Sequence, residues 1–368
     1  MDKQINLSDL PEALLPWYQQ NRRDLPWRRD KDPYHIWVSE IMLQQTRVEA
    51  VKGYYARFMD VLPTMASLAE CDDNVLQKLW EGLGYYTRVR NLKKAAQQIM
   101  SCHNGVFPRE YEKVLALPGI GKYTAGAICS IAFNMPTPAV DGNVLRVITR
   151  ITDDATPIDS PALKRTVQQR LAEVYPAQAG AFTQALMELG ATVCGPNRAP
   201  ECEKCPCKDF CLGYKHGTAE SLPVKAPKAP RKIEELTVFV LFCDGRFAVQ
   251  KRPGKGLLAG LWQFPNVSGK FSGQDAVEKV EQIGVKPKEI LLQVERKHVF
   301  THIEWRMNGI YMETAEENDQ FCWMSADQIR QQVALPTAFK LFWDEMDTAE
   351  NSKIFQKKTE KVFDKMDI

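Results

Sequence analysis

Apolar residues recur at every third or fourth position through most of residues 1–218. This spacing places them on one face of an α-helix, so the pattern predicts an all-α domain. Loops that contain glycine and proline separate the helical segments, for example at Gly105–Pro108 and Pro136–Pro138. The segments with helical spacing are 36–59, 74–81, 88–101, 111–117, 124–133, 142–152, 161–174 and 179–193.

The pattern changes to a strand period in the last third of the chain. Ile303, Trp305 and Met307 alternate with polar residues, as in a half-buried strand. Asp244-Gly245, between two apolar runs, favours a β-hairpin. This part of the chain therefore predicts an α+β domain. The hairpin strands are expected at 236–243 and 246–251, and further helices near 274–283 and 325–333.

A proline-rich segment, 219–233, separates the two parts. Proline fixes the backbone and removes a hydrogen-bond donor, so we expect an extended linker. Between positions 223 and 233 it carries four basic residues and no acidic one, so this short segment is the strongly basic part of the chain, and it could lie along a surface. The predicted organisation is a helical domain at 1–218, the linker at 219–233, an α+β domain at 234–350 and a polar, loosely ordered tail at 351–368.

Composition excludes several classes of protein. With 44% hydrophobic and 26% charged residues among 368, the chain is neither collagen-like nor disordered. No apolar run approaches the ~20 residues of a membrane span. The N-terminus lacks a basic region followed by an apolar stretch, so we expect a cytosolic (cytoplasmic) location. The net charge of +2 does not by itself suggest a nucleic-acid partner.

Five of the ten cysteines fall between positions 194 and 211. Four of them, spaced C-x7-C-x2-C-x5-C, can enclose a zinc ion or an iron–sulfur cluster. Zinc sites usually pair two C-x2-C knuckles, and only one knuckle is present, so the spacing favours an iron–sulfur cluster. Structural disulfides are not expected in the cytosol. The four cysteines are Cys194, Cys202, Cys205 and Cys211, and Cys207 is left over.

A turn that contains Gly119 and Gly121 lies in the segment Leu117–Gly126, between two predicted helices. Gly119 and Gly121 allow a tight turn that directs backbone N–H groups outward at the start of the next helix. A helix N-terminus favours an anion, and a DNA phosphate is one such anion. The alternative is that this Gly-x-Gly pattern is only a turn.

Asp141 follows in the segment Pro138–Arg146. An aspartate directly before a helix most often serves as its N-cap. The alternative places the Asp141 carboxylate beside the glycine turn, facing the DNA that the turn would hold.

The turn, the following acid and the cysteine loop resemble the helix-hairpin-helix superfamily of DNA glycosylases and its endonuclease III branch. Within that branch the chain is most similar to the adenine DNA glycosylase (MutY) family, over about residues 1–345. Two further stretches carry the resemblance, Trp37–Arg47 and Trp80–Arg88. A third feature is Tyr123. Bifunctional relatives have at this position a lysine that forms a Schiff base with the sugar, and this chain has no amine there, so the resemblance implies a monofunctional hydrolase.

One feature departs from the family pattern. Seven residues separate Cys194 from Cys202, where the family usually has six. A one-residue bulge would accommodate the difference, and so would replacement of one ligand by Cys207.

The resemblance implies a role for each catalytic residue. Glu40 would protonate adenine at N7, and its apolar neighbours should raise its pKa through desolvation. Asp141, near a helix N-terminus and its donors, is expected to keep a low pKa and to stabilise the developing sugar cation. Asn143 and Tyr123 would orient the acid, the water and the sugar. Without the resemblance, Glu40 would be interpreted as a solvated helix residue.

Binding residues are implied in the same way. The wedges that enter the DNA stack would be Gln45 and Tyr85, and the glycine turn, expected within a helix-hairpin-helix at 111–133, would bind the DNA backbone. Arg23 and Arg28 could equally contact phosphates or belong to a solvated basic face. The residues that match the family's adenine pocket are Arg23, Leu25, Trp27, Arg28 and Gln184.

The C-terminal part resembles a Nudix fold. Its segment Val277–Gly284 lacks the arginine and one glutamate of the Nudix hydrolase motif, so nucleotide hydrolysis is not expected. The resemblance implies that Phe300, Thr301 and His302 read 8-oxoguanine. Without it, these residues would be a polar hairpin tip over a buried phenylalanine.

The resemblance therefore implies a monomeric base-excision-repair enzyme with a [4Fe-4S] cluster, a two-lobed helical domain and a Nudix-like domain. Its reaction would be hydrolysis of the N-glycosidic bond of adenine mispaired with 8-oxoguanine or guanine in double-stranded DNA. Two other functions remain open. One is a bifunctional endonuclease III-type glycosylase/lyase for oxidised pyrimidines, and the other is a catalytically silent mismatch-binding protein.

Overall fold

The computed structural model describes residues 7–196, 198–227, 229–348 and 351. The chain forms two compact units, one of Met1–Cys71 with Thr87–Lys228 and the other of Asp72–Tyr86 with Ala229–Ile368. Most of the predicted tail, 352–368, lies outside the described residues. None of the described helices is both long and apolar enough to cross a membrane.

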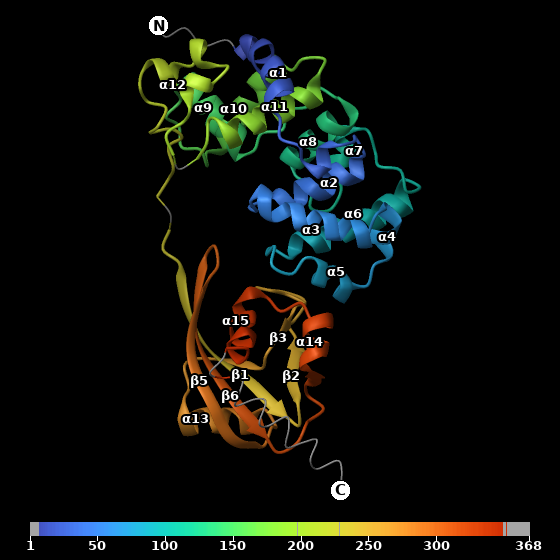
Figure 1. The fold of residues 1–368 in the computed structure, drawn as a ribbon, viewed down its shortest axis with the longest axis vertical. Helices are drawn as coiled ribbons and strands as arrows, with labels where there is room; N and C mark the ends of the chain where they lie inside the picture. Colours follow the sequence, from blue (N-terminus) through green and yellow to red (C-terminus); the bar gives the residue numbers. More distant parts are fainter. Residues whose placement is uncertain (1–6, 197, 228, 349–350, 352–368) are drawn as a thin grey trace. The chain divides into compact units, whose positions relative to one another are not determined.

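The first unit is helical in the described residues, as its apolar spacing predicts (Figure 1). Sequence spacing did not predict α1 or α4. Its elements are η1 (Leu7–Asp9), α1 (Leu10–Asn21), η2 (Pro26–Arg28), α2 (Pro33–Leu43), α3 (Val48–Val61), α4 (Met65–Glu70), α6 (Thr87–Cys102), α7 (Tyr111–Leu115), α8 (Lys122–Phe133), α9 (Gly142–Thr152), α10 (Pro161–Ala172), α11 (Ala179–Thr192), η3 (Cys202–Lys204), η4 (Lys208–Phe210) and α12 (Leu212–Lys215).

One lobe of this unit is built around α2 and α8, which contact each other. Both helices are apolar on most sides and bury most of their residues, as helices in the centre of a lobe do. The segment expected to be helical at 36–59 is two helices, because the chain turns at Gln44–Arg47 between α2 and α3. Gln45, in this turn, has a left-handed backbone with φ of 58°.

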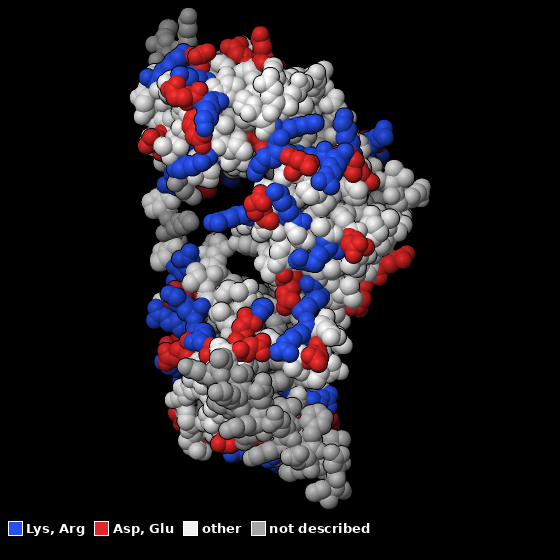
Figure 2. Space-filling model, viewed as in Figure 1, with Lys and Arg blue, Asp and Glu red and all other residues white. Residues whose placement is uncertain are grey.

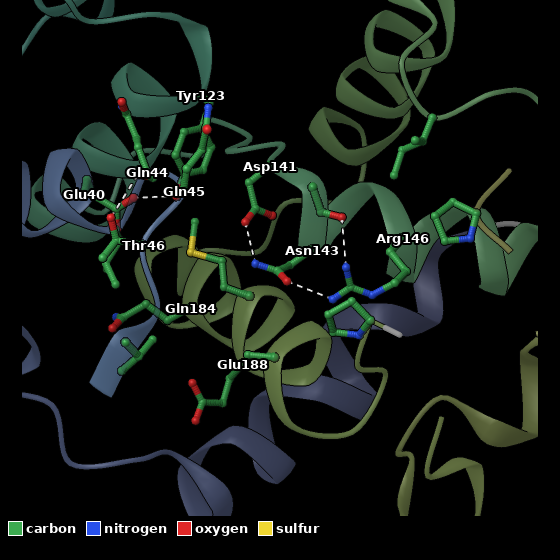
Figure 3. A pocket seen from close by; sticks show the side chains of 18 of the residues that line it. Glu40, Gln44, Gln45, Thr46, Tyr123, Asp141, Asn143, Arg146, Gln184 and Glu188 are labelled. Carbon is green, nitrogen blue, oxygen red and sulfur yellow. Dashed lines mark hydrogen bonds between the residues drawn. The ribbon is translucent and has the colours of Figure 1, made fainter. Parts of the chain in front are cut away.

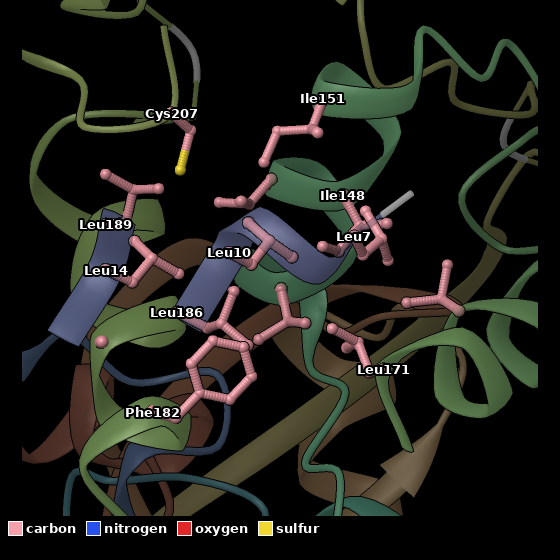
Figure 4. Close-up of a cluster of buried hydrophobic side chains, with 14 of the residues drawn as sticks. Leu7, Leu10, Leu14, Ile148, Ile151, Leu171, Phe182, Leu186, Leu189 and Cys207 are labelled. Carbon is pink, nitrogen blue, oxygen red and sulfur yellow. The ribbon is translucent and has the colours of Figure 1, made fainter. Parts of the chain in front are cut away.

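The other lobe has its own hydrophobic core, shared by α1, α9, α10 and α11 (Figure 4). Leu10 and Leu14 of α1 are fully buried there, with Phe182 and Leu189 of α11. Cys207, from the cysteine loop, is also fully buried in this core. Through Cys207, the hydrophobic core therefore holds the cysteine loop against α1, α9, α10 and α11.

The second unit contains one mixed sheet with the order β3-β2-β1-β6-β5, in which β1 and β6 run parallel. Helix α13 covers one face, and α14 and α15 cover the other (Figure 1). Its elements are α5 (Asp73–Leu79), β1 (Lys232–Cys243), β2 (Arg246–Lys251), β3 (Trp262–Gln263), β4 (Asn266–Ser268), α13 (Gly273–Gln282), β5 (Pro287–Val299), β6 (Ile303–Thr314), β7 (Cys322–Ser325), α14 (Ala326–Gln332) and α15 (Thr337–Met346).

The predicted fold class is confirmed, an all-α domain followed by an α+β domain. The hairpin at Asp244-Gly245 forms as expected, with Cys243 opposite Arg246. The parallel pairing of β1 with β6 was not predicted, because spacing within a strand carries no information about its partner. Charged residues of both signs are interspersed over the visible surface of both units, in keeping with the small net charge (Figure 2).

Candidate active site

A cavity of about 1200 Å³ in the first unit brings together residues that are far apart in the sequence (Figure 3). Its walls come from η2 and α2, from the starts of α8 and α9, and from α11, so both lobes contribute. Every residue predicted for catalysis or for the adenine pocket lines it, and so does one predicted wedge. These residues are Arg23, Leu25, Trp27, Arg28, Glu40, Gln45, Tyr123, Asp141, Asn143 and Gln184.

Glu40 lies on the buried helix α2 and is only 6% exposed. The Tyr123 hydroxyl, from α8, donates a hydrogen bond of 2.5 Å to Glu40 Oε2. Burial raises the pKa of Glu40 to about 7; the Tyr123 hydrogen bond opposes the rise and the charge of Asp141 adds to it. Glu40 is thus a carboxyl group that can hold a proton near neutral pH.

Asp141 is the N-cap of α9, which is the commoner of its two predicted roles. It accepts hydrogen bonds of 2.7 Å from the Val144 backbone N–H and from Asn143 Nδ2. The expectation of a low pKa is wrong in direction. Burial raises the pKa of Asp141, and the donors from Val144 and Asn143 only offset part of this effect. Asp141 also lines the cavity, so the capping role and the cavity-facing role occur together.

Arg146, which sequence reasoning missed, joins this acid to the cysteine loop. Its Nη2 donates to Asn143 Oδ1 at 2.8 Å, and Asn143 in turn donates to Asp141. Its Nε donates to the carbonyl of Cys194 at 2.8 Å. The sequence did contain a signal for this contact: Asn143 and Arg146 are three residues apart, which places them one turn apart on the same face of a helix.

Glu188 is a second residue that sequence reasoning missed. It lies one turn after Gln184 on α11, lines the cavity and is fully buried. Its carboxylate pairs with both arginines of the predicted adenine pocket, Arg23 at 2.6 Å and Arg28 at 2.8 Å. Arg23 and Arg28 therefore both pair with a buried carboxylate; the Arg28 side chain is largely buried, whereas that of Arg23 stays about one-third exposed.

The two predicted wedge residues, Gln45 and Tyr85, have the same uncommon backbone conformation. Gln45 and Tyr85 both have positive φ, 58° and 46°, which costs a residue with a side chain about 1 kcal/mol or more. Both are exposed, Tyr85 to 51%. Strained, exposed polar and aromatic residues of this kind commonly mark functional positions.

Gly119 and Gly121 of the glycine turn do not line the cavity, whereas Tyr123, which follows them, does. Gly119 has φ of 76°, and a Cβ there would lie 2.6 Å from Asn91 Cβ, so glycine is required. Gly121 is the N-cap of α8 and has a negative φ. A Cβ at this position would meet no atom within 4 Å. The α8 N–H groups at this end have no side-chain cap.

The predicted lesion-reading residues belong to the second unit, at the tip between β5 and β6. Phe300 packs edge-to-face on Trp305 and on His298, with ring centroids 4.9 and 4.5 Å apart. Thr301 is exposed, and its hydroxyl lies 3.0 Å from the hydroxyl of Tyr85 in the same unit. The neighbouring His302 is exposed as well.

Comparison with known proteins gives the family. Residues 38–175 match the HhH-GPD superfamily of base excision DNA repair proteins, and residues 237–345 match the NUDIX domain. The chain is 36% identical to adenine DNA glycosylase of Homo sapiens, over 82% of this chain and 66% of that protein. It is 35% identical to the Mus musculus enzyme of the same name, over 94% of this chain and 76% of the other. The chain belongs to the adenine DNA glycosylase family.

The fold of the helical unit has a solved counterpart. A thermostable thymine-DNA glycosylase is 29% identical and superposes with a TM-score of 0.51, covering 56% of this chain and 94% of that one. In length, the chain spans just under two thirds of the human family member, 66%.

In this family member, four cysteines line a small cavity beside α9 and α11. They are the predicted set, Cys194, Cys202, Cys205 and Cys211. Cys207 does not line this cavity, although it is buried in the same hydrophobic core as Cys211, which does. Among the described residues that line the cavity there is no carboxylate, and Arg150 Nη1 lies 3.2 Å from Cys194 Sγ. Thiolates with a cationic donor suit an iron–sulfur cluster. Within the described part of the chain, no three His, Cys, Asp or Glu side chains converge on a point where they could hold a single metal ion; the four cysteines surround a cavity.

Proposed function

We propose that the protein is a monofunctional DNA glycosylase that hydrolyses the N-glycosidic bond of adenine mispaired with 8-oxoguanine or guanine. The observation that carries this proposal is Glu40, a buried carboxyl with a pKa of about 7 that shares one cavity with Asp141. A group that is protonated and a carboxylate that is held by donors are what cleavage of a glycosidic bond requires.

The first step is departure of the base. Glu40 donates its proton to adenine N7 while the bond between C1′ and N9 breaks and its electron pair goes to the base. Tyr123, hydrogen-bonded to Glu40, keeps the carboxyl turned toward the cavity. The leaving base is then neutral adenine rather than an anion.

The second step is capture of the sugar by water. Asp141 stabilises the positive charge that develops on the sugar, and Asn143 holds that carboxylate in place. Water adds to C1′ and gives its proton to the Glu40 carboxylate, which regenerates the acid. The resulting product is an abasic site with the strand intact. Tyr123 carries no amine, so no Schiff base with the sugar forms there.

The base has to leave the duplex to enter the cavity, which costs a few kcal/mol. Gln45 and Tyr85 would offset this cost by filling the space left in the stack. Arg23, Leu25, Trp27, Arg28 and Gln184 would enclose the extruded adenine. The glycine turn with Gly119 and Gly121 and the free N–H groups of α8 would hold a DNA phosphate.

The tip of the second unit would read the opposite base. Phe300, Thr301 and His302 are exposed or half-exposed, and the Thr301 and Tyr85 hydroxyls lie together. Two hydroxyls at this position can donate to and accept from 8-oxoguanine. Discrimination between 8-oxoguanine and guanine would therefore reside in this unit.

Cys194, Cys202, Cys205 and Cys211 would hold a [4Fe-4S] cluster, which supplies a covalent brace across the loop when bound. Cys207 is absent from the cavity lining, whereas Cys211, buried in the same hydrophobic core, belongs to it; this difference supports the exclusion of Cys207 from the ligand set. Purified protein should absorb light at about 400 nm and contain iron and sulfide. Colourless protein with stoichiometric zinc would refute the cluster.

The deciding experiment is adenine release from a duplex with 8-oxoguanine opposite adenine, followed by borohydride trapping. Release without trapped covalent complex supports the proposal. Trapping on duplexes with oxidised pyrimidines would identify a glycosylase/lyase instead, and tight binding without release would identify a silent mismatch binder. Glu173 is the exposed C-cap residue of α10. Glu173→Gln is therefore a control that matches the change of charge in Glu40→Gln, and it should remain active.

A further inference from the structure

The Glu188 carboxylate lines the cavity and has no exposed side-chain surface. Gln184 and Glu188 lie one turn apart on α11, and both face the cavity (Figure 3). A buried carboxylate is costly unless charged or polar partners compensate it. The reaction proposed above does not use Glu188, so its presence in the cavity wall calls for a separate role.

Four donors from two arginines converge on this carboxylate. Arg23 contributes its backbone N–H at 3.2 Å and its Nε at 2.6 Å to Oε1, and its Nη2 at 3.0 Å to Oε2. Arg28 contributes its Nη2 to Oε2 at 2.8 Å. Burial acts to raise the pKa of Glu188, but the hydrogen bonds and charges of Arg23 and Arg28 outweigh it, so the pKa lies below its usual value. Glu188 is therefore ionised at neutral pH.

Three further charged or titratable groups lie next to the arginines, namely Glu49, Tyr18 and Arg22, and the charge of Arg22 acts on Tyr18. Glu49 of α3 acts on Arg23 through its charge, and Tyr18 of α1 lies under the Arg28 guanidinium at 5.7 Å. Because Tyr18 is neutral at working pH and its pKa is raised, it balances no charge. The cluster of Arg23, Arg28 and Glu188 thus carries one net positive charge within the wall of the base pocket.

This charge matters for Glu40. Three groups face the Glu40 carboxyl: the Tyr123 hydroxyl from α8, Asp141 from the start of α9, and Arg28 from η2. The charge of Arg28 lowers the pKa of Glu40 against the dominant effect of burial. Removing the Glu188 charge would leave the paired guanidiniums of Arg23 and Arg28 without their buried counter-ion, and Arg28 acts directly on the acid that has to hold a proton.

We propose that Glu188 is a positioning residue of the glycosylase site: it fixes Arg23 and Arg28 in the wall of the base pocket and offsets their charge, so that Glu40 keeps its proton at neutral pH. This inference rests on the proposed function and adds a residue to it. The arginines then present their remaining N–H donors to the base with one net positive charge instead of two.

The test is a series of variants that changes the charge of the cluster in steps. Arg23→Gln makes the cluster neutral, the wild type carries one positive charge, and Glu188→Gln leaves two. The double variant Arg23→Gln/Glu188→Gln returns the cluster to one positive charge with neutral amides in place of the ion pair. Single-turnover adenine release from the 8-oxoguanine:adenine duplex is measured with saturating enzyme from about pH 5.5 to 9.

In the wild type the rate should fall as the pH rises through the Glu40 pKa of about 7, because the acid form is the active one. Glu188→Gln should move this midpoint down by about 0.5 to 1 pH unit, so that the rate above it falls ~3- to 10-fold. Arg23→Gln should move the midpoint up. The double variant should return it to the wild-type value, and Glu188→Asp, which keeps the charge, should stay nearer the wild type than Glu188→Gln.

Midpoints that do not follow the charge of the cluster would overturn the inference, and Glu188 would then be a purely structural ion-pair partner. Circular dichroism establishes which variants are folded. If Glu188→Gln does not fold, the comparison of Arg23→Gln with the double variant still decides, because these two differ by the same Glu188 charge. A wild type that releases no adenine refutes the proposed function and this inference with it, whereas an active wild type with invariant midpoints refutes only the inference.

Discussion

The base pocket of the first unit and the tip of the second unit differ in how their polar groups are held. In the pocket, Glu40 and Glu188 are almost inaccessible to solvent, and each has fixed hydrogen-bond donors. At the tip, Thr301 is exposed, and Tyr85, whose hydroxyl contacts it, is 51% exposed. Burial changes pKa values and fixes geometry before substrate arrives, whereas exposure leaves a group free to meet an incoming surface.

This contrast separates the consequences of substitution in the two places. Changes in the pocket should alter the rate of bond cleavage while binding of DNA survives. Changes at the tip should alter the choice of opposite base while the rate of cleavage survives. The predictions below test this separation.

The largest effect is expected for Glu40→Gln. Glutamine fills the same space but has no proton to donate, so single-turnover adenine release should fall about 1,000-fold. Binding of the 8-oxoguanine:adenine duplex should stay within a few-fold of the wild type in a gel-shift titration. A loss of binding as large as the loss of rate would remove the distinction between pocket and tip.

Asp141→Asn should have the second largest effect. Asparagine is as good an N-cap as aspartate, so α9 and the melting temperature should be preserved while the charge is lost. Without the carboxylate facing the sugar, the rate should fall about 100-fold. If the rate were nearly normal, Asp141 would be only a cap.

Tyr123→Phe should change the pH dependence more than the maximal rate. The Tyr123 hydrogen bond lowers the pKa of Glu40 by stabilising its ionised form, so removing it should raise that pKa. Since the acid form is active, the fall in rate on the alkaline side should move to higher pH by about 0.5 to 1 unit. This direction is opposite to that expected for Glu188→Gln, and a shift to lower pH would contradict the arrangement described for Glu40.

The smallest effect is expected at the tip. Thr301→Val keeps the shape of the side chain and removes one hydroxyl, which is worth about 0.5–1.5 kcal/mol in a hydrogen bond. The preference for 8-oxoguanine:adenine over guanine:adenine should fall about 2- to 10-fold in competition binding, with the saturated cleavage rate unchanged. Tyr85→Phe, which removes the partner hydroxyl, is the matched variant. An effect on the saturated rate would show that the two regions are not separate in function.

Much of the fold was accessible from the sequence, because it depends on local pattern. Apolar spacing predicted α6, α9 and α11 to within a few residues. The turn pair Asp244-Gly245 predicted its hairpin correctly. By contrast, the break between α2 and α3 was missed, since Gln44–Arg47 contains neither glycine nor proline to mark it.

The residue types of the site were also accessible from the sequence, since each motif is a short run of neighbours. Glu40, Tyr123, Asp141 and Gln184 could be named without the structure, through family resemblance. Their meeting in one cavity, and the pKa of about 7 for Glu40, depend on burial between two lobes, which no run of neighbours specifies.

Tertiary structure alone decided two further points. It brought Glu188 onto Arg23 and Arg28, residues about half the chain away, and so paired a fully buried carboxylate with two partly buried guanidiniums. It put Cys207 into the hydrophobic core and left four other cysteines around one cavity, which their spacing left open. The physical reason is the same in each case: spacing along the chain determines which face of an element a residue occupies, and only packing determines what that face meets.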